Sequence, residues 1–128
     1  MAYKILVVDD EEDIVTILRI RLKASGYEVI TAADGQDALD KARHEKPDLI
    51  LLDVMLPKLD GFKVCRMLKF DEQYKAIPIV LLSARTQDTD LEIGKQQGAD
   101  AYITKPFQHD AVLAKVKELL ARPSPSVS

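Results

Sequence analysis

A run of four aliphatic residues ends in an acid at Leu49-Ile50-Leu51-Leu52-Asp53, and Val54-Met55-Leu56-Pro57 follows directly. Continuous apolar runs of this length, without alternating polar residues, are typical of strands covered on both faces, as in parallel sheets. Burying a carboxylate at the mouth of such a strand costs free energy, so an acid at this place is expected to serve a function. The stretch therefore predicts a buried parallel strand with a functional acid, Asp53, at its carboxyl end.

Shorter or equal apolar runs recur four more times, at Ile5–Val8, at Val29-Ile30 with Tyr27, at Ile79–Leu82 and at Ala101–Ile103. Between the runs, apolar residues recur with a period near four, which predicts helices around 14–22, 38–42, 64–68, 88–97 and 112–120. Five strand–helix units in succession favour one α/β domain of (βα)5 type. This is an open, doubly wound parallel sheet with helices on both faces.

The composition narrows the class of protein. The chain has 128 residues, 47% of them hydrophobic, and its longest apolar run has four residues, so we expect one domain and no membrane helix. The net charge of −3 argues against direct nucleic-acid binding, which needs a basic surplus. A single cysteine excludes an internal disulfide, so we expect a reducing, cytoplasmic compartment.

Domain organisation is simple. Residues 1–121 are predicted to form the domain. The segment 122–128, Arg-Pro-Ser-Pro-Ser-Val-Ser, cannot continue a helix and is predicted to be a C-terminal tail or linker stub. Such a stub fits either a stand-alone protein or a domain cut from a longer one.

Polar residues follow four of the five predicted strands: Asp9-Asp10, Asp53, Ser83 and Lys105-Pro106. In open parallel sheets, ligands bind beyond the carboxyl ends of the strands. If the first and third strands are neighbours, their ends lie roughly 5 Å apart, and three carboxylates crowd together there. Such a group needs a compensating cation, and hard oxygen ligands favour magnesium over zinc. Together with an amine and a hydroxyl, this set suits phosphoryl transfer to a carboxylate.

Each feature also has an ordinary structural interpretation. The acids after the first strand can be stabilising charges at a helix N-terminus. Ser83 alone, or Lys105-Pro106 alone, is most often part of a turn. The functional interpretation depends on their joint occurrence at strand ends, and Asp53 is the residue least easily explained as structural.

The chain resembles the receiver domain of two-component response regulators from about Lys4 to Leu120. The matching pieces are Ile5–Asp10, Asp48–Pro57 with Asp60-Gly61 behind it, Leu82-Ser83-Ala84, and Gly98–Phe107. Four motifs in this order and spacing are a specific signal. The resemblance implies a flavodoxin-like fold with strand order 2-1-3-4-5.

The resemblance also implies roles for the acids. Asp53 would accept a phosphoryl group from a phosphohistidine on a sensor histidine kinase or a histidine phosphotransfer protein. Mg²⁺, or Mn²⁺ in its place, would be bound by the carboxylates of Asp10 and Asp53 and by the backbone carbonyl of Met55. Asp9 would act on the metal through water. The domain would catalyse only its own phosphorylation and dephosphorylation, and would not be an enzyme for an external substrate.

Other residues would carry the switch. Lys105 would bind a phosphoryl oxygen, and its bond to Pro106 would be cis. Ser83 would hydrogen-bond another phosphoryl oxygen, and Tyr102 would turn inward when Ser83 moves. The alternative for Tyr102 is an edge-strand aromatic that merely packs. Partner binding would be controlled by the face formed by the helix around 88–97, the strand at 101–103 and the helix at 112–120.

The downstream partner, a separate protein or an attached effector domain, stays open. Asp100-Ala101 stands where winged-helix regulators of the family usually carry an acidic pair. This weakens the case for their dimer and leaves a monomer or a weak, phosphorylation-dependent dimer.

Two other functions are weaker. A magnesium-dependent phosphohydrolase resembling haloacid dehalogenases would need Asp-x-Asp after the first strand, where this chain has adjacent Asp9-Asp10. A flavin-binding module would need a phosphate-cradling loop there, and the acids Asp9-Asp10-Glu11-Glu12 would repel a phosphate.

Overall fold

The computed structural model describes residues 2–56, 58–83, 93 and 95–121. Five parallel strands form one sheet in the order β2-β1-β3-β4-β5. The strands are β1 (Lys4–Val8), β2 (Glu28–Ala32), β3 (Leu49–Asp53), β4 (Ile79–Ser83) and β5 (Ala101–Thr104). The helices are α1 (Glu12–Ala24), α2 (Gly35–Glu45), α3 (Gly61–Lys69) and α5 (His109–Ala121).

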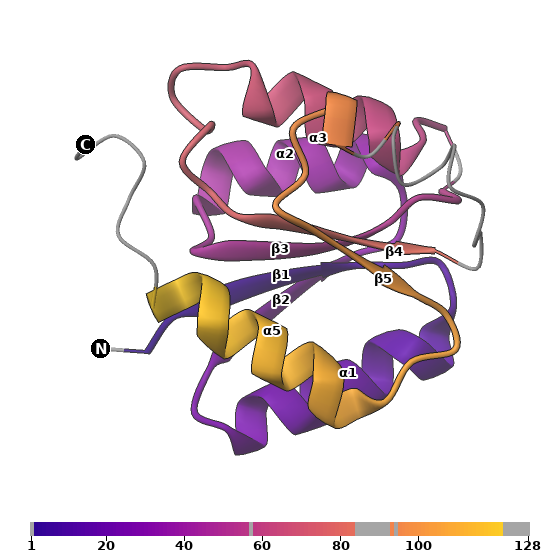
Figure 1. Ribbon diagram of the computed structural model, residues 1–128, viewed down its shortest axis with the longest axis vertical. Coiled ribbons are helices and arrows are strands. Elements are labelled where there is room, and N and C mark those ends of the chain that lie inside the picture. Colours follow the sequence, from indigo (N-terminus) through magenta and orange to yellow (C-terminus); the bar gives the residue numbers. More distant parts are fainter. Residues whose placement is uncertain (1, 57, 84–92, 94, 122–128) are drawn as a thin grey trace.

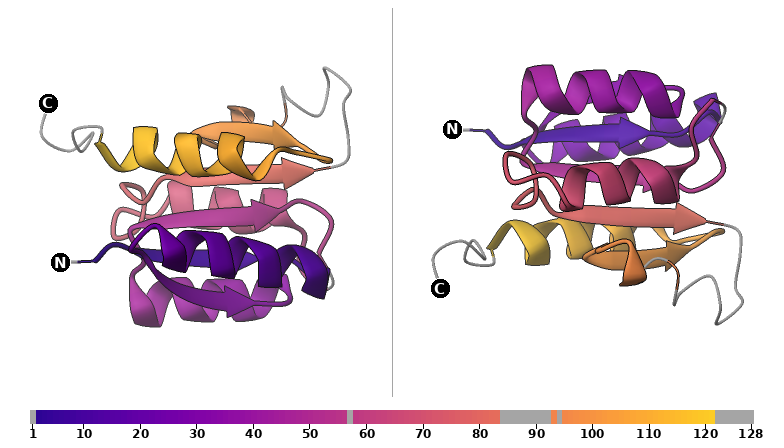
Figure 2. Two further views of the ribbon diagram at one scale, coloured as in Figure 1. Left: turned by 90° about the horizontal axis from the view of Figure 1, so that it is seen from below. Right: turned by 90° about the horizontal axis from the view of Figure 1, so that it is seen from above.

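The sheet is the middle layer of three. Helices α2 and α3 cover one face, and α1 and α5 cover the other (Figures 1 and 2). The aliphatic strands supply both interfaces, because successive side chains point to opposite faces. Leu6, Val8 and Leu52 pack toward α2 and α3, whereas Ile5, Val7 and Leu51 pack toward α1 and α5. The predicted doubly wound sheet and its strand order are therefore confirmed.

Two helices begin at an aspartate followed by a glycine. Asp34 caps α2 by accepting a hydrogen bond from the Asp37 amide at 2.8 Å, and Asp60 caps α3 in the same way from Lys63 at 3.0 Å. These bonds satisfy amides that a helix N-terminus leaves without partners. Both caps lie at the carboxyl end of the sheet, so the helices start beside the predicted site.

A second polar cluster lies at the amino end of the sheet. Lys69 donates to Asp100 at 2.9 Å and to the Ile77 carbonyl at 3.0 Å, while the same Asp100 oxygen accepts from the Ile79 amide at 2.8 Å. Cys65, fully buried on α3, donates to the Gln97 carbonyl at 3.5 Å. These contacts join α3 to the starts of β4 and β5.

Several predicted features fall outside the described residues. They are Pro57 and Ala84 of the quoted motifs, most of the predicted helix at 88–97, and the predicted tail 122–128. Within that helix, residues 93, 95 and 96 are helical, and the Gln97 amide donates to the Ile93 carbonyl at 3.0 Å. Among the described helices, none has both the length and the apolar character that crossing a membrane requires.

Candidate functional site

The strand register brings the predicted site residues to one edge of the sheet. Val8 pairs with Leu52. Asp9 and Asp53 are the next residues along the chain, so they lie beside each other at the ends of β1 and β3. Ser83 ends β4 and pairs with Thr104, which directly precedes Lys105. Because the strands are parallel, all of these carboxyl ends meet at the same edge.

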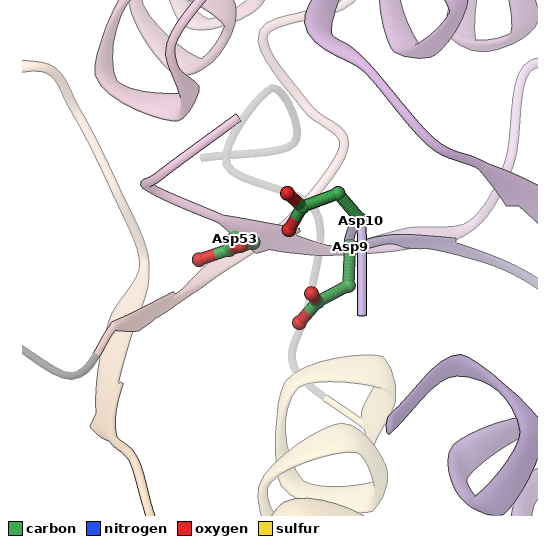
Figure 3. A group of neighbouring side chains, drawn as sticks. All are labelled: Asp9, Asp10 and Asp53. Carbon is green, nitrogen blue, oxygen red and sulfur yellow. The ribbon is translucent and has the colours of Figure 1, made fainter. Parts of the chain in front are cut away.

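Three carboxylates converge at this edge (Figure 3). Asp9, Asp10 and Asp53 each offer an oxygen, and these oxygens lie within 4.8 Å of one another. Asp9 and Asp53 are only 2% exposed, whereas Asp10 is open to solvent. Two buried carboxylates and one accessible carboxylate therefore form a pocket of concentrated negative charge.

Lys105, which directly follows β5, also reaches this pocket. Its ammonium lies 2.7 Å from Asp9, 3.3 Å from Glu11 and 3.6 Å from Asp53. The Lys105–Pro106 peptide bond is cis. Glu11 was not singled out by sequence reasoning as a partner of this lysine; its place two residues after Asp9 was the available signal. The tightest ion pair of Lys105 is with Asp9, so its contact with Asp53 is secondary in this state.

Backbone amides orient the two buried acids. The Glu11 amide donates to Asp9 at 2.9 Å, and the Met55 amide donates to Asp53 at 3.2 Å. The chain then turns sharply, with the Val54 carbonyl accepting from both Leu56 at 3.2 Å and Gly61 at 2.9 Å. Asp53 is thus held at the base of a short loop between β3 and α3.

The pocket makes ionisation of Asp53 unfavourable. Burial, reinforced by the charge of Asp9, raises the pKa of Asp53 to about 6, although Lys105 acts in the opposite direction. For Lys105, burial alone would lower the pKa, but its hydrogen bond to Asp9 and the charge of Asp53 outweigh burial and raise it. The lysine therefore stays charged, and the acids still carry more charge than it neutralises.

The family comparison agrees with this geometry. A family model described as "Response regulator receiver domain" matches residues 5–117. The chain belongs to this family. Receiver domains are phosphoacceptor switches of two-component systems, and this membership favours neither the phosphohydrolase nor the flavin-binding alternative.

The chain is also similar to individual members of this family. The chain is 56% identical over 122 residues to the alkaline phosphatase synthesis transcriptional regulatory protein PhoP of Bacillus subtilis (strain 168), which covers 95% of this chain and 50% of that protein. The chain thus spans about half the length of that relative.

Solved structures of receiver domains have the same fold. The chemotaxis response regulator CheY4 of Vibrio cholerae is 35% identical, with a TM-score of 0.87 over 93% of this chain and 99% of that one. The BeF3-activated DrrB receiver domain is 37% identical, with a TM-score of 0.87 over 95% of this chain and all of that one.

The residues of this receiver domain fit a divalent cation. The cluster offers only oxygen donors, which hard cations such as Mg²⁺ prefer. Burial and the charge of Asp9 together raise the pKa of Asp53, so a bound cation would favour its ionised form. Asp10 adds a solvent-open carboxylate through which a hydrated ion could enter.

The two predicted switch residues lie on adjacent strands of the receiver domain. Ser83 is fully buried at the end of β4. Tyr102 lies in the middle of β5, is partly buried, and packs against the core cluster beneath α2 and α3. Ser83 is thus near the strand ends that hold Asp53 and Lys105, while Tyr102 pairs with Leu81, two residues before the end of β4.

Proposed function

We propose that Asp53 accepts a phosphoryl group from a phosphohistidine in a Mg²⁺-dependent reaction that the domain catalyses itself. The observation that carries this proposal is the convergence of Asp9, Asp10 and Asp53 within 4.8 Å, with Lys105 in contact with two of them. A carboxylate oxygen of Asp53 attacks phosphorus, and the bond from phosphorus to the histidine nitrogen breaks with its electrons leaving on the imidazole.

The metal would be held by Asp10, by Asp53 and by the backbone carbonyl of Met55, with Asp9 acting through water. When bound, Mg²⁺ or Mn²⁺ supplies positive charge that offsets the carboxylates and the phosphoryl oxygens. Lys105 supplies a second, fixed positive charge for a phosphoryl oxygen, because its ammonium already lies 3.6 Å from Asp53. The same groups, with water as the nucleophile, support self-dephosphorylation.

Phosphorylation would then act on Ser83 and Tyr102. A phosphoryl group on Asp53 adds charge and strong acceptor oxygens at the strand ends, which attract the buried Ser83 hydroxyl. Movement of Ser83 opens space into which Tyr102, now only partly buried, moves further. We propose that the affected surface is the face formed by β5, α5 and the predicted helix at 88–97.

The partners follow from this chemistry. The donor is a sensor histidine kinase or a histidine phosphotransfer protein, and the output is a downstream protein or an effector domain. The domain acts as a monomer or a weak, phosphorylation-dependent dimer and does not bind nucleic acid itself. We place the exchange in the cytoplasm, since the one cysteine is a free, buried thiol, as reducing compartments favour.

Intact mass after incubation with acetyl phosphate tests this proposal. The wild type is expected to gain one phosphoryl increment with Mg²⁺ and none with EDTA, whereas Asp53→Asn gains none in either case. Asp60→Asn is the matched control, because it removes a carboxylate from the same loop while an asparagine still caps α3. Its mass gain should equal that of the wild type.

Two results would contradict the proposal. Full labelling of Asp53→Asn would remove Asp53 from its role. Absence of any increment in the wild type, with acetyl phosphate and with a purified autophosphorylated histidine kinase alike, would show that the domain does not accept phosphate.

A further inference from the structure

The first residue of α2 lies unusually close to the loop that follows Asp53. A Cβ at Gly35 would lie 1.9 Å from the Leu59 carbonyl oxygen and 2.7 Å from its carbonyl carbon. Side chains do not approach backbone atoms this closely, so any side chain at residue 35 must displace the loop or the start of the helix. We propose that Gly35 is a positioning residue for the magnesium site, acting through the β3–α3 loop.

The β3–α3 loop is short, and both of its ends are held beside Asp53, so a displacement of one of its residues is expected to move the others. The Val54 carbonyl accepts hydrogen bonds from Leu56 and from Gly61, which closes the loop on itself. At Gly61, a Cβ would lie 2.2 Å from the Asp53 carbonyl oxygen, so α3 starts directly against the Asp53 backbone. Met55 lies inside this closed turn, and its amide also binds the Asp53 carboxylate. We expect a shift at Leu59 to change where the Met55 backbone lies relative to that carboxylate, because both residues belong to the same short loop closed on Val54.

A second contact joins the same two segments. Lys58, which has a left-handed backbone with φ of 68°, places its ammonium 3.6 Å from the Asp34 carboxylate. Asp34 also caps α2, and its bond from the Asp37 amide, together with the charge of Lys58, lowers its pKa against the opposing effect of burial. The ion pair is exposed and adds little energy. The close backbone contact at Gly35 is therefore the stronger of the two contacts that join α2 to this loop.

This inference rests on the proposed function, because it assigns the Met55 carbonyl to the metal. Residues that orient metal ligands without touching the ion commonly change metal affinity by about 10- to 100-fold when replaced. Gly35→Ala moves a whole loop that carries one ligand of several. We therefore expect it to weaken Mg²⁺ binding by about tenfold, at the lower end of that range.

The experiment measures Mg²⁺ binding directly, without a phosphoryl donor. Amide chemical shifts of ¹⁵N-labelled protein are followed by NMR during titration with MgCl₂, which gives the Kd and shows in the same spectra that each variant is folded. Gly26→Ala is the matched control. It strains a glycine with φ of 93° at the end of α1, where an added Cβ meets nothing within 4 Å, and so destabilises the chain without touching the loop.

The proposal predicts a raised Mg²⁺ Kd for Gly35→Ala and an unchanged Kd for Gly26→Ala. At saturating Mg²⁺, Gly35→Ala should again accept a phosphoryl group from acetyl phosphate. Equal Kd values for folded Gly35→Ala and wild type would overturn it, as would an equal loss of affinity in Gly26→Ala. If Gly35→Ala does not fold, Leu59→Ala takes its place. Leu59 packs partly buried against the core beneath α2, so its loss frees the loop and should also raise the Kd.

The two proposals fail separately. If the wild type binds Mg²⁺ and is phosphorylated on Asp53 while Gly35→Ala behaves identically, only the role of Gly35 is wrong. If the wild type accepts no phosphate, the proposed function is wrong whatever the variants do.

Discussion

Two lysines of this domain are paired with acids that are buried or partly buried, and the two pairs differ in charge balance. At the amino end of the sheet, Lys69 meets one acid, Asp100, and the remaining bonds of both side chains go to the backbone at Ile77 and Ile79. At the carboxyl end, Lys105 lies within 4.0 Å of Asp9, Glu11 and Asp53, with Asp10 nearby.

The difference separates structural from functional use of the same residue types. The Lys69 pair is neutral overall and satisfied by hydrogen bonds, so it serves to hold α3, β4 and β5 together. The Lys105 cluster has more acids than cations, and part of it is buried. Such an arrangement lowers stability, so we expect it at a site that binds a cation or a phosphoryl group. The following predictions test that contrast.

Breaking the Lys69–Asp100 pair should have the largest effect on stability. Lys69→Met removes the ammonium, leaves Asp100 largely buried without its cation, and should reduce the free energy of unfolding by about 3 kcal/mol. Urea denaturation in EDTA measures this loss. Mg²⁺ affinity should stay at the wild-type value because Lys69 lies at the other end of the sheet. A loss of stability below about 0.5 kcal/mol would place Lys69 among ordinary surface lysines.

Removing a negative charge from the Lys105 cluster should increase the free energy of unfolding. The folded-state pKa of Asp53 is raised from 3.8 to about 6, so the wild type loses stability as the pH rises through this range. Without divalent cations, Asp53→Asn should therefore be more stable than wild type by about 2 kcal/mol at pH 7.5. The difference should shrink as the pH falls from 6 toward 3.8, because folded Asp53 becomes protonated, and should vanish below 3.8, where Asp53 is protonated in the folded and the unfolded state. Urea midpoints measured across this pH range would reveal a constant difference if the charge of Asp53 were not responsible.

A third lysine pair, open to water, should have almost no effect. Lys75 lies 2.9 Å from Glu72, yet their side chains are 50% and 87% exposed. Lys75→Ala should change the free energy of unfolding by less than about 0.5 kcal/mol, because solvent and salt screen exposed pairs. If urea denaturation gave a loss comparable with that of Lys69→Met, burial would not be what distinguishes the pairs.

The strands were predictable because burial on both faces leaves a continuous aliphatic signal. The third run was predicted at Leu49–Leu52 and the strand spans Leu49–Asp53. Helix ends were less accurate. The second helix was predicted around 38–42 and spans Gly35–Glu45, because its polar first and last turns carry no apolar period. The strand order came from the resemblance to the family and not from periodicity.

The site was predictable to the level of which residues meet. The rule that parallel strands present their carboxyl ends at one edge placed Asp9, Asp10 and Asp53 together. It could not show that Lys105 contacts Asp9 more closely than Asp53, since that depends on side-chain reach. Nor could it show the approach of Leu59 to Gly35, because a backbone contact across more than twenty residues leaves no periodic pattern.

The buried thiol of α3 has a practical consequence for labelling. Burial raises the pKa of Cys65 to about 12, so at pH 7.5 the side chain is almost entirely the unreactive thiol. The native cysteine is therefore not expected to react with maleimide dyes in the folded protein. A single added cysteine on an exposed position of α5, such as Ala114→Cys, would carry a fluorophore at one defined place while leaving Cys65 in the chain. Such a dye would report partner docking in real time.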